Sequence, residues 1–209
     1  MTKPNPFTLI SKWYTRITLI LLLFMSQYTA FAQTEFEVPD NVLLNYSFEY
    51  LDVFARPVSW LPQNTKDQYV IKTYKDPFTK LSSLMITPRP NAAADRGAGL
   101  CNTVISALVL KGKKKITVKA NIKTKDLADG VASLWMQLNG SVSILADVNS
   151  DAKSAKGTTD WQTVTIELPI PEDAVVQMAV FGCKMTGTGV AYFDEFEVFL
   201  DGERVRDIM

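Results

Sequence analysis

Asp194 is the residue whose position raises the clearest chemical question. Two glycines in Thr186–Gly189 favour a tight connection, and the next eleven residues alternate as a strand does. Strict alternation places Asp194 with Tyr192 and Phe196 on the more apolar face. An inward carboxylate is costly unless it is paired, hydrogen-bonded or bound to a cation. The sequence therefore predicts a partner for Asp194, either a cation or backbone amides of the Thr186–Gly189 loop.

A second set of candidate residues lies on one face of the predicted strand at 131–139. Apolar side chains alternate there with larger polar or aromatic ones, and the outward positions are Trp135, Gln137 and Asn139. A flat ring beside amide donors and acceptors suits the C–H faces and hydroxyls of a sugar. The alternative is that a loop or a partner domain covers Trp135. These three residues are the candidate ligand site.

Trp161 is a further aromatic residue whose role the sequence leaves open. It follows Gly157–Asp160 at the entrance to a predicted strand. A large ring at such a position more often fills the end of a core than contacts a ligand. We therefore expect Trp161 to pack inward, with ligand contact as the alternative.

The overall composition excludes several classes of function. Histidine is absent, which removes the commonest general base and excludes Ser-His-Asp and Cys-His catalysis within this chain. The chain carries 22 basic and 22 acidic residues, and three of the basic ones, Lys3, Lys12 and Arg16, lie in a leader without acids. Without these three residues, the chain has 19 basic and 22 acidic residues. This balance gives no electrostatic reason to expect a nucleic-acid partner.

Residues 1–32 have the pattern of an export signal. Basic residues precede a nine-residue apolar segment, Ile17–Met25. Ala30–Ala32 then has the small-x-small pattern of a signal-peptidase cleavage site. The apolar segment is too short for a membrane helix, which needs about 20 residues, so we favour cleavage over an uncleaved anchor. We expect a mature chain from Gln33, secreted or periplasmic, with no stable membrane insertion.

Export would make a disulfide chemically possible. The two cysteines, Cys101 and Cys183, each lie in a predicted strand. Isolated thiols of this kind serve equally well as small buried hydrophobic side chains. The sequence leaves both interpretations open.

The sequence pattern of the mature chain predicts a series of short strands separated by turns. Ile116–Lys123 alternates strictly, Asn139-Gly140 is a hairpin signal, and Val175–Met185 is apolar enough for a central strand. No segment shows a sustained helical period. We therefore predict an all-β fold, a two-sheet antiparallel β-sandwich of the jelly-roll type. The expected organisation is a signal peptide at 1–32, a lead-in at 33–40, the sandwich at 41–203 and a tail at 204–209.

Several segments carry a family resemblance. They are Asn45–Glu49, Pro57–Trp60, Ile122–Thr124, Leu134–Met136, Gly157–Trp161, and Gly187–Gly189 leading into Phe193–Phe196. Together they resemble galactose-binding-like jelly rolls of the carbohydrate-binding-module type. More narrowly, the chain resembles the accessory domain that precedes erythromycin-esterase-like hydrolases and carboxy-terminal-processing-type serine peptidases in secreted bacterial proteins.

The resemblance has two implications for sites. Modules of this kind draw calcium oxygens from the segment that here ends in Glu49, so Glu49 and Asp194 are the candidate ligands of a structural calcium between the two ends of the mature chain. Calcium takes about six to eight oxygens, so backbone carbonyls would have to contribute. The resemblance also implies a shared scaffold with variable specificity rather than a particular ligand.

The expected function is that of a secreted non-catalytic binding module for a carbohydrate or a protein surface. The alternative is an accessory subunit or remnant of a secreted esterase or peptidase whose catalytic domain is on another chain. No enzymatic activity is expected, because the sequence ends at Met209 without the residues of the attached hydrolases.

Overall fold

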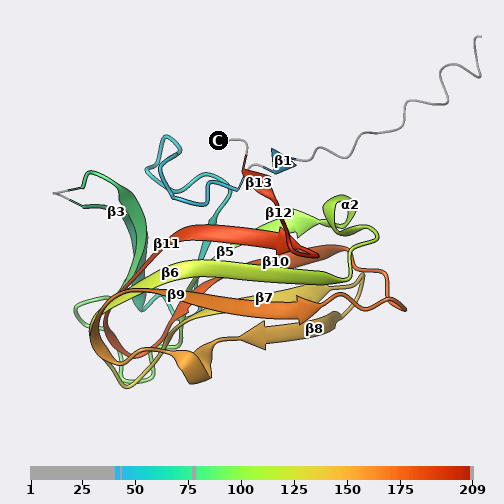
Figure 1. Ribbon diagram of the computed structural model, residues 1–209. Coiled ribbons are helices and arrows are strands. Elements are labelled where there is room, and N and C mark those ends of the chain that lie inside the picture. The colour runs from blue at the N-terminus through green and yellow to red at the C-terminus, as the bar shows by residue number, and fades with distance from the viewer. Residues whose placement is uncertain (1–40, 43, 77–78, 208–209) are drawn as a thin grey trace, which may run out of the picture. The chain divides into compact units, whose positions relative to one another are not determined.

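The structure, a computed structural model, describes residues 41–42, 44–76 and 79–207 (Figure 1). The described residues belong to the unit Pro39–Met209, which the description below concerns. The predicted signal peptide and lead-in therefore lie outside the described residues. Within the described ranges, no helix is long and apolar enough to span a membrane.

Two antiparallel sheets face each other, as predicted (Figure 1). The five-stranded sheet has the order β2 (Leu61–Asn64), β5 (Gly99–Ser106), β10 (Met178–Met185), β7 (Ala132–Asn139), β8 (Ile144–Asn149). The other sheet has the order β3 (Tyr69–Lys75), β4 (Ser82–Pro88), β11 (Thr188–Leu200), β6 (Lys115–Ala128), β9 (Gly157–Pro169), with β12 (Glu203–Arg204) paired to β11. We call it the six-stranded sheet. The all-β sandwich is confirmed, and β10 is the central strand of its sheet.

Alternation along the strands builds the core between the sheets. On β6 the side chains of Ile116, Val118, Ala120 and Ile122 are buried, whereas the residues between them are half-buried on the outer face. On β7 the same pattern buries Leu134, Met136 and Leu138. Each sheet therefore turns an apolar face inward and a polar face toward solvent, as half-buried antiparallel strands do.

Two local features differ from the sequence-based expectation. The apolar segment Leu100–Leu110, whose composition suits a strand with a bend, is β5 followed by a single helical turn, α2 (Ala107–Leu110). The hairpin after Asn139 has a four-residue loop, closed by a hydrogen bond from the Gly140 amide to the Ser143 carbonyl (2.9 Å), before β8 begins at Ile144. A short 3₁₀ turn, η1 (Asp151–Lys153), follows β8.

The two ends of the described chain meet, as expected. β1 (Asn41–Val42) pairs in parallel with β13 (Arg206–Asp207), and the Phe196 amide donates to the Tyr46 carbonyl at 3.0 Å. The Phe48 ring packs edge-on against Phe196 with centroids 5.9 Å apart. The segment that holds Glu49 therefore lies beside the strand that holds Asp194.

Candidate functional site

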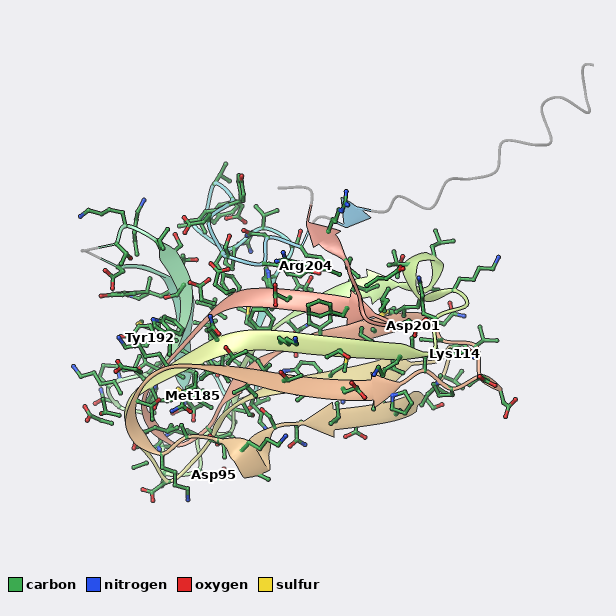
Figure 2. The ribbon with its side chains drawn as sticks, in the orientation of Figure 1. Asp95, Lys114, Met185, Tyr192, Asp201 and Arg204 are labelled. Carbon is green, nitrogen blue, oxygen red and sulfur yellow. The ribbon has the colours of Figure 1, made fainter. Side chains whose placement is uncertain are left out.

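A cavity of about 530 Å³ opens on the outer face of the six-stranded sheet. Every strand of the main sheet path contributes to its lining, from β3 on one side to β9 on the other. Figure 2 labels Tyr192, one of the lining residues, near the lower end of β3. The volume falls within the range typical of small-ligand pockets, about 300 to 1,000 Å³.

Three aromatic side chains line the cavity. The rings of Tyr74 on β3 and Tyr192 on β11 contact each other, with centroids 5.3 Å apart and planes inclined by 59°. Burial and the neighbouring Tyr74 raise the pKa of Tyr192, so its hydroxyl stays protonated and can donate a hydrogen bond. On the far side, Trp161 of β9 leaves 44% of its surface exposed. The expectation that Trp161 packs into the core is therefore wrong.

A β-bulge lies at Trp161 on β9. Ile122 on β6 pairs with Gln162 on β9, but Thr124, two residues later, pairs with Thr159. Two residues of β9, Asp160 and Trp161, thus oppose the single residue Lys123. The outward direction of Trp161 follows from alternation along β9, because Ile166 and Leu168 are the buried residues of this strand.

A second bulge places Asp194 in the same cavity. Asp194 pairs with Asn121, but Glu197 pairs with Lys119, so β11 carries one extra residue, and Glu195 adopts a left-handed φ of 52°. Phe193 and Phe196 are both buried as a result. The prediction that Asp194 shares the inward face with Phe196 is wrong, because the bulge breaks the alternation and turns Asp194 outward.

The Asp194 carboxyl has unusual electrostatics for a surface-facing acid. Burial raises its pKa to about 7, against a smaller lowering by the hydrogen bond from the Glu195 amide (2.8 Å), and the charges of Glu195 and Glu49 raise it further. The amide that binds Asp194 is thus that of the next residue, rather than one of the amides of the Thr186–Gly189 loop that the sequence suggested.

Glu49 and Asp194, the predicted calcium ligands, come close enough to influence each other's charge. The two Glu49 oxygens accept hydrogen bonds from the Ser82 amide (2.6 Å) and the Ser82 hydroxyl (3.0 Å). Among the described residues, no group of three or more acidic, cysteine or histidine side chains is placed to hold a metal ion. The fold therefore brings together two of the oxygen donors that calcium needs, and the rest would have to be backbone carbonyls or water.

The predicted ligand residues on β7 lie on the other sheet. Trp135, Gln137 and Asn139 are half-buried and share the outer face of the five-stranded sheet. The Trp135 ring lies toward β10, where its indole N–H donates to the Cys183 carbonyl at 3.3 Å. The side-chain oxygen of Asn139 is buried without a hydrogen-bond partner among the described residues. The three residues come together as expected, and their role in binding stays a prediction.

Sequence reasoning missed most of the cavity. It did not single out Tyr74, Asn121 or Lys123, and it counted Tyr192 as inward. The alternation of β6 did signal that Asn121 and Lys123 face away from the core. The alternation of β9 likewise places Trp161 on the face opposite Ile166 and Leu168. What the sequence could not signal was the β11 bulge, which turns Asp194 outward.

Comparison with known proteins assigns the fold and no family. No family model matches the chain. The uncharacterized HTH-type transcriptional regulator YbfP of Bacillus subtilis is 32% identical over 82 residues, which are 39% of this chain and 27% of that protein. The matched part is thus about a quarter of that curated relative.

Solved structures with the same fold differ widely in function. The enzymatically active domain of tailspike protein 4 from bacteriophage CBA120 gives a TM-score of 0.56 at 11% identity, covering 77% of this chain and 21% of that one. A Stig cyclase from Fischerella sp. TAU gives 0.55 at 13% identity, covering 77% and 96%. A CBM4 structure gives 0.49 at 18% identity, covering 76% and 99%. At these identities the likeness to the tailspike domain and the cyclase shows a shared β-sandwich fold and nothing about the ligand.

Proposed function

We propose that the protein is a carbohydrate-binding module whose ligand occupies the cavity on the outer face of the six-stranded sheet. The observation that carries the proposal is the combination of Tyr74, Tyr192 and Trp161 around a cavity that also presents amide and carboxyl groups. Sugars offer apolar C–H faces to aromatic rings and hydroxyls to polar side chains. A site with both kinds of group is suited to them.

The polar groups are placed to bind hydroxyls. Asn121 lies directly opposite Asp194 on the adjacent strand, and its side-chain oxygen already accepts a hydrogen bond from the Thr163 hydroxyl at 2.8 Å. This contact fixes the Asn121 amide and leaves its N–H₂ group free to donate to a ligand. Asp194 and Glu195 supply acceptors on the β11 side. Preorganised polar groups of this kind lower the entropic cost of binding.

The test is a glycan array with the mature chain, followed by titration of the best ligand against variants. Trp161→Ala and Tyr192→Ala should each abolish or strongly weaken binding with little change in melting temperature, because both rings are at least partly exposed. Trp135→Ala is the matched control on the opposite sheet. If Trp135→Ala abolishes binding and Trp161→Ala does not, the ligand lies at the β7 residues and the proposed cavity is wrong.

We propose that binding occurs without catalysis. The support is the absence of histidine, the commonest general base. Chromatography of a bound oligosaccharide after prolonged incubation should return it intact. The appearance of shorter products would show that the cavity is an active site.

Secretion and a partner chain are further parts of the proposal. The support for export is the leader at residues 1–32, and amino-terminal sequencing of the mature protein should start at Gln33. A protein-surface ligand, or a role as accessory subunit of a secreted esterase or peptidase, would appear as a specific protein recovered with the mature chain from periplasmic extract. Such a partner, combined with an empty glycan array, would replace the carbohydrate proposal.

The structural calcium between Glu49 and Asp194 also remains a proposal. Its support is the proximity of the two carboxylates and the raised pKa of Asp194, since a cation would relieve their mutual repulsion. Millimolar calcium should then raise the melting temperature relative to excess chelator, and Asp194→Asn should remove that difference. Equal melting temperatures of the wild type under both conditions would exclude the metal.

A further inference from the structure

We propose that the ligand of this cavity carries an anionic substituent, which lies over Lys123 and Lys125 between the rings of Tyr192 and Trp161. This inference rests on the proposed function and narrows it to acidic glycans. The chemistry that the two lysines recognise is a carboxylate or sulfate group on a sugar ring. The argument starts from the register of β6 with its neighbours.

Lys123 stands between two aromatic residues on adjacent strands. It pairs directly with Tyr192 on β11 and lies opposite the bulge that contains Trp161 on β9. All three residues line the cavity, and Lys125, two residues along β6, lines it as well. Residues two apart on a strand share a face, so both ammonium groups are on the cavity side of the sheet.

The lysines of β6 differ in what they contact. Lys115 forms an ion pair with Glu167 at 3.1 Å, and the Lys119 ammonium lies 4.7 Å from the centre of the Phe199 ring. Among the ion pairs and hydrogen bonds of the described residues, none involves the side chain of Lys123 or Lys125. The two β6 lysines outside the cavity therefore have a charged or aromatic partner, whereas the two that line the cavity have none among the described residues.

Three acidic residues, Asp76, Asp194 and Glu195, line the same cavity as the two lysines. Among the ion pairs of the described residues, none joins Asp194 or Glu195 to Lys123 or Lys125. The cavity is therefore divided into a β11 side with acceptors for hydroxyls and a β6 side with cations. Asp160, the other residue of the β9 bulge, is not part of the lining.

A sugar ring stacked on Tyr192 or Trp161 would extend an equatorial substituent toward Lys123. A neutral hydroxymethyl group there would leave both ammonium groups without a counter-charge, whereas a carboxylate or sulfate would pair with them. Lys123 is half-buried, so its ion pair would be screened less by salt than a fully exposed one. The two lysines thus favour an anionic over a neutral substituent at this position of the cavity.

The experiment compares matched ligands by calorimetry with the mature chain. The probes are oligogalacturonate, the same oligomer after chemical reduction of its carboxyl groups, and a sulfated galactan oligomer of equal length. The wild type should bind one or both anionic probes at least about tenfold more tightly than the reduced probe, since a charge-assisted hydrogen bond contributes about 1.5 to 3 kcal/mol and each 1.4 kcal/mol is a factor of ten. The preferred anionic probe identifies carboxylate or sulfate as the natural group.

Variants of β6 separate this inference from the underlying function. Lys123→Gln and Lys125→Gln should remove the preference for the anionic probes, while Lys119→Gln, on the same face of the same strand, should keep it. Equal affinity for the anionic and reduced probes, with loss of binding in Trp161→Ala, would overturn the anionic ligand and leave glycan binding in place. Absence of binding to every glycan, here and on the array, would overturn both.

Discussion

At the scale of single residues, Glu195 has the largest consequence for the site. Its left-handed φ of 52° accommodates the extra residue of the β11 bulge, and this changes which neighbours face the core. A non-glycine residue in this region is uncommon, and such strain is concentrated at functional sites. Without the bulge, Asp194 would point into the sandwich with Phe196. With it, both phenylalanines are buried and the carboxyl reaches the cavity.

The position of Asp194 predicts an unusual dependence of stability on pH. Its pKa rises from 3.8 in the unfolded chain to about 7 in the fold, so the folded state binds the proton more tightly. The stabilisation is fully present below pH 3.8 and is lost as the pH rises through about 7. In excess chelator, Asp194→Asn should therefore raise the melting temperature relative to the wild type at pH 8 and not at pH 4.

Thermal melts of both proteins across this pH range, with Asp201→Asn as a control acid outside the cavity, would check the prediction. A constant difference between Asp194→Asn and the wild type from pH 4 to pH 8 would contradict it. The same series in calcium gives a second result, because a bound cation would stabilise the ionised carboxylate and reverse the advantage of the variant at pH 8.

At the scale of elements, the segment before β2 connects the two sheets through the side chain of Trp60. The Trp60 ring contacts Phe196 of β11 with centroids 4.7 Å apart and Phe181 of β10 at 6.4 Å, and it also contacts Phe48 at 4.8 Å. Its indole N–H donates to the Leu44 carbonyl at 2.7 Å. One side chain thus connects the amino-terminal segment to a strand of each sheet.

Removal of this ring should destabilise the protein strongly. Trp60→Ala is expected to lower the free energy of unfolding by about 3 to 5 kcal/mol, the range for large aromatic truncations in cores. Denaturant titration would measure the change, with the partly exposed Trp161→Ala as the comparison. A loss of unfolding free energy below about 1 kcal/mol, the average for ordinary point mutations, would mean that Trp60 is not part of the cooperative core.

The cysteines belong to the central part of the five-stranded sheet. Cys101 of β5 and Cys183 of β10 lie directly opposite each other, both are fully buried free thiols, and the Cys183 Sγ approaches the Cys101 carbonyl at 3.6 Å. Burial raises the pKa of both thiols, so neither forms the reactive thiolate. Of the two interpretations left open by the sequence, the structure favours buried hydrophobic thiols.

Alkylation of the mature chain provides the test. Iodoacetamide should label neither cysteine in the native protein and both after unfolding without a reductant. A mature chain that takes up no label after unfolding, and gains two labels only when reductant is added, would contain a disulfide between the paired strands instead.

At the scale of the whole molecule, the sequence was sufficient for the architecture and insufficient for the site. The strict alternation of β6 and β7 and the apolar β10 predicted a sandwich with β10 at its centre, because burial of one face depends on local periodicity. The direction of Asp194 depends on the β11 bulge, a one-residue shift in its pairing with β6. A local pattern does not show where such a shift will fall, so Asp194 was assigned to the wrong side. Trp161 was expected in the core from its place at the strand entrance, although the alternation of β9 puts it on the outer face.

The sandwich therefore presents two aromatic faces on opposite sheets, one with Trp135 and one with Trp161. The Trp135 side chain already donates its N–H to the backbone, whereas Trp161 borders a cavity with unpaired lysines. Our account assigns the ligand to the second face. The tryptophans themselves can report which face is used.

The most direct measurement is fluorine NMR of the mature chain labelled with 5-fluorotryptophan, titrated with the best glycan from the array. The described chain contains Trp60, Trp135 and Trp161, and single substitutions assign their resonances. The account predicts that the Trp161 resonance shifts in proportion to bound ligand while those of Trp60 and Trp135 stay in place. A shift of the Trp135 resonance with an unchanged Trp161 would contradict it.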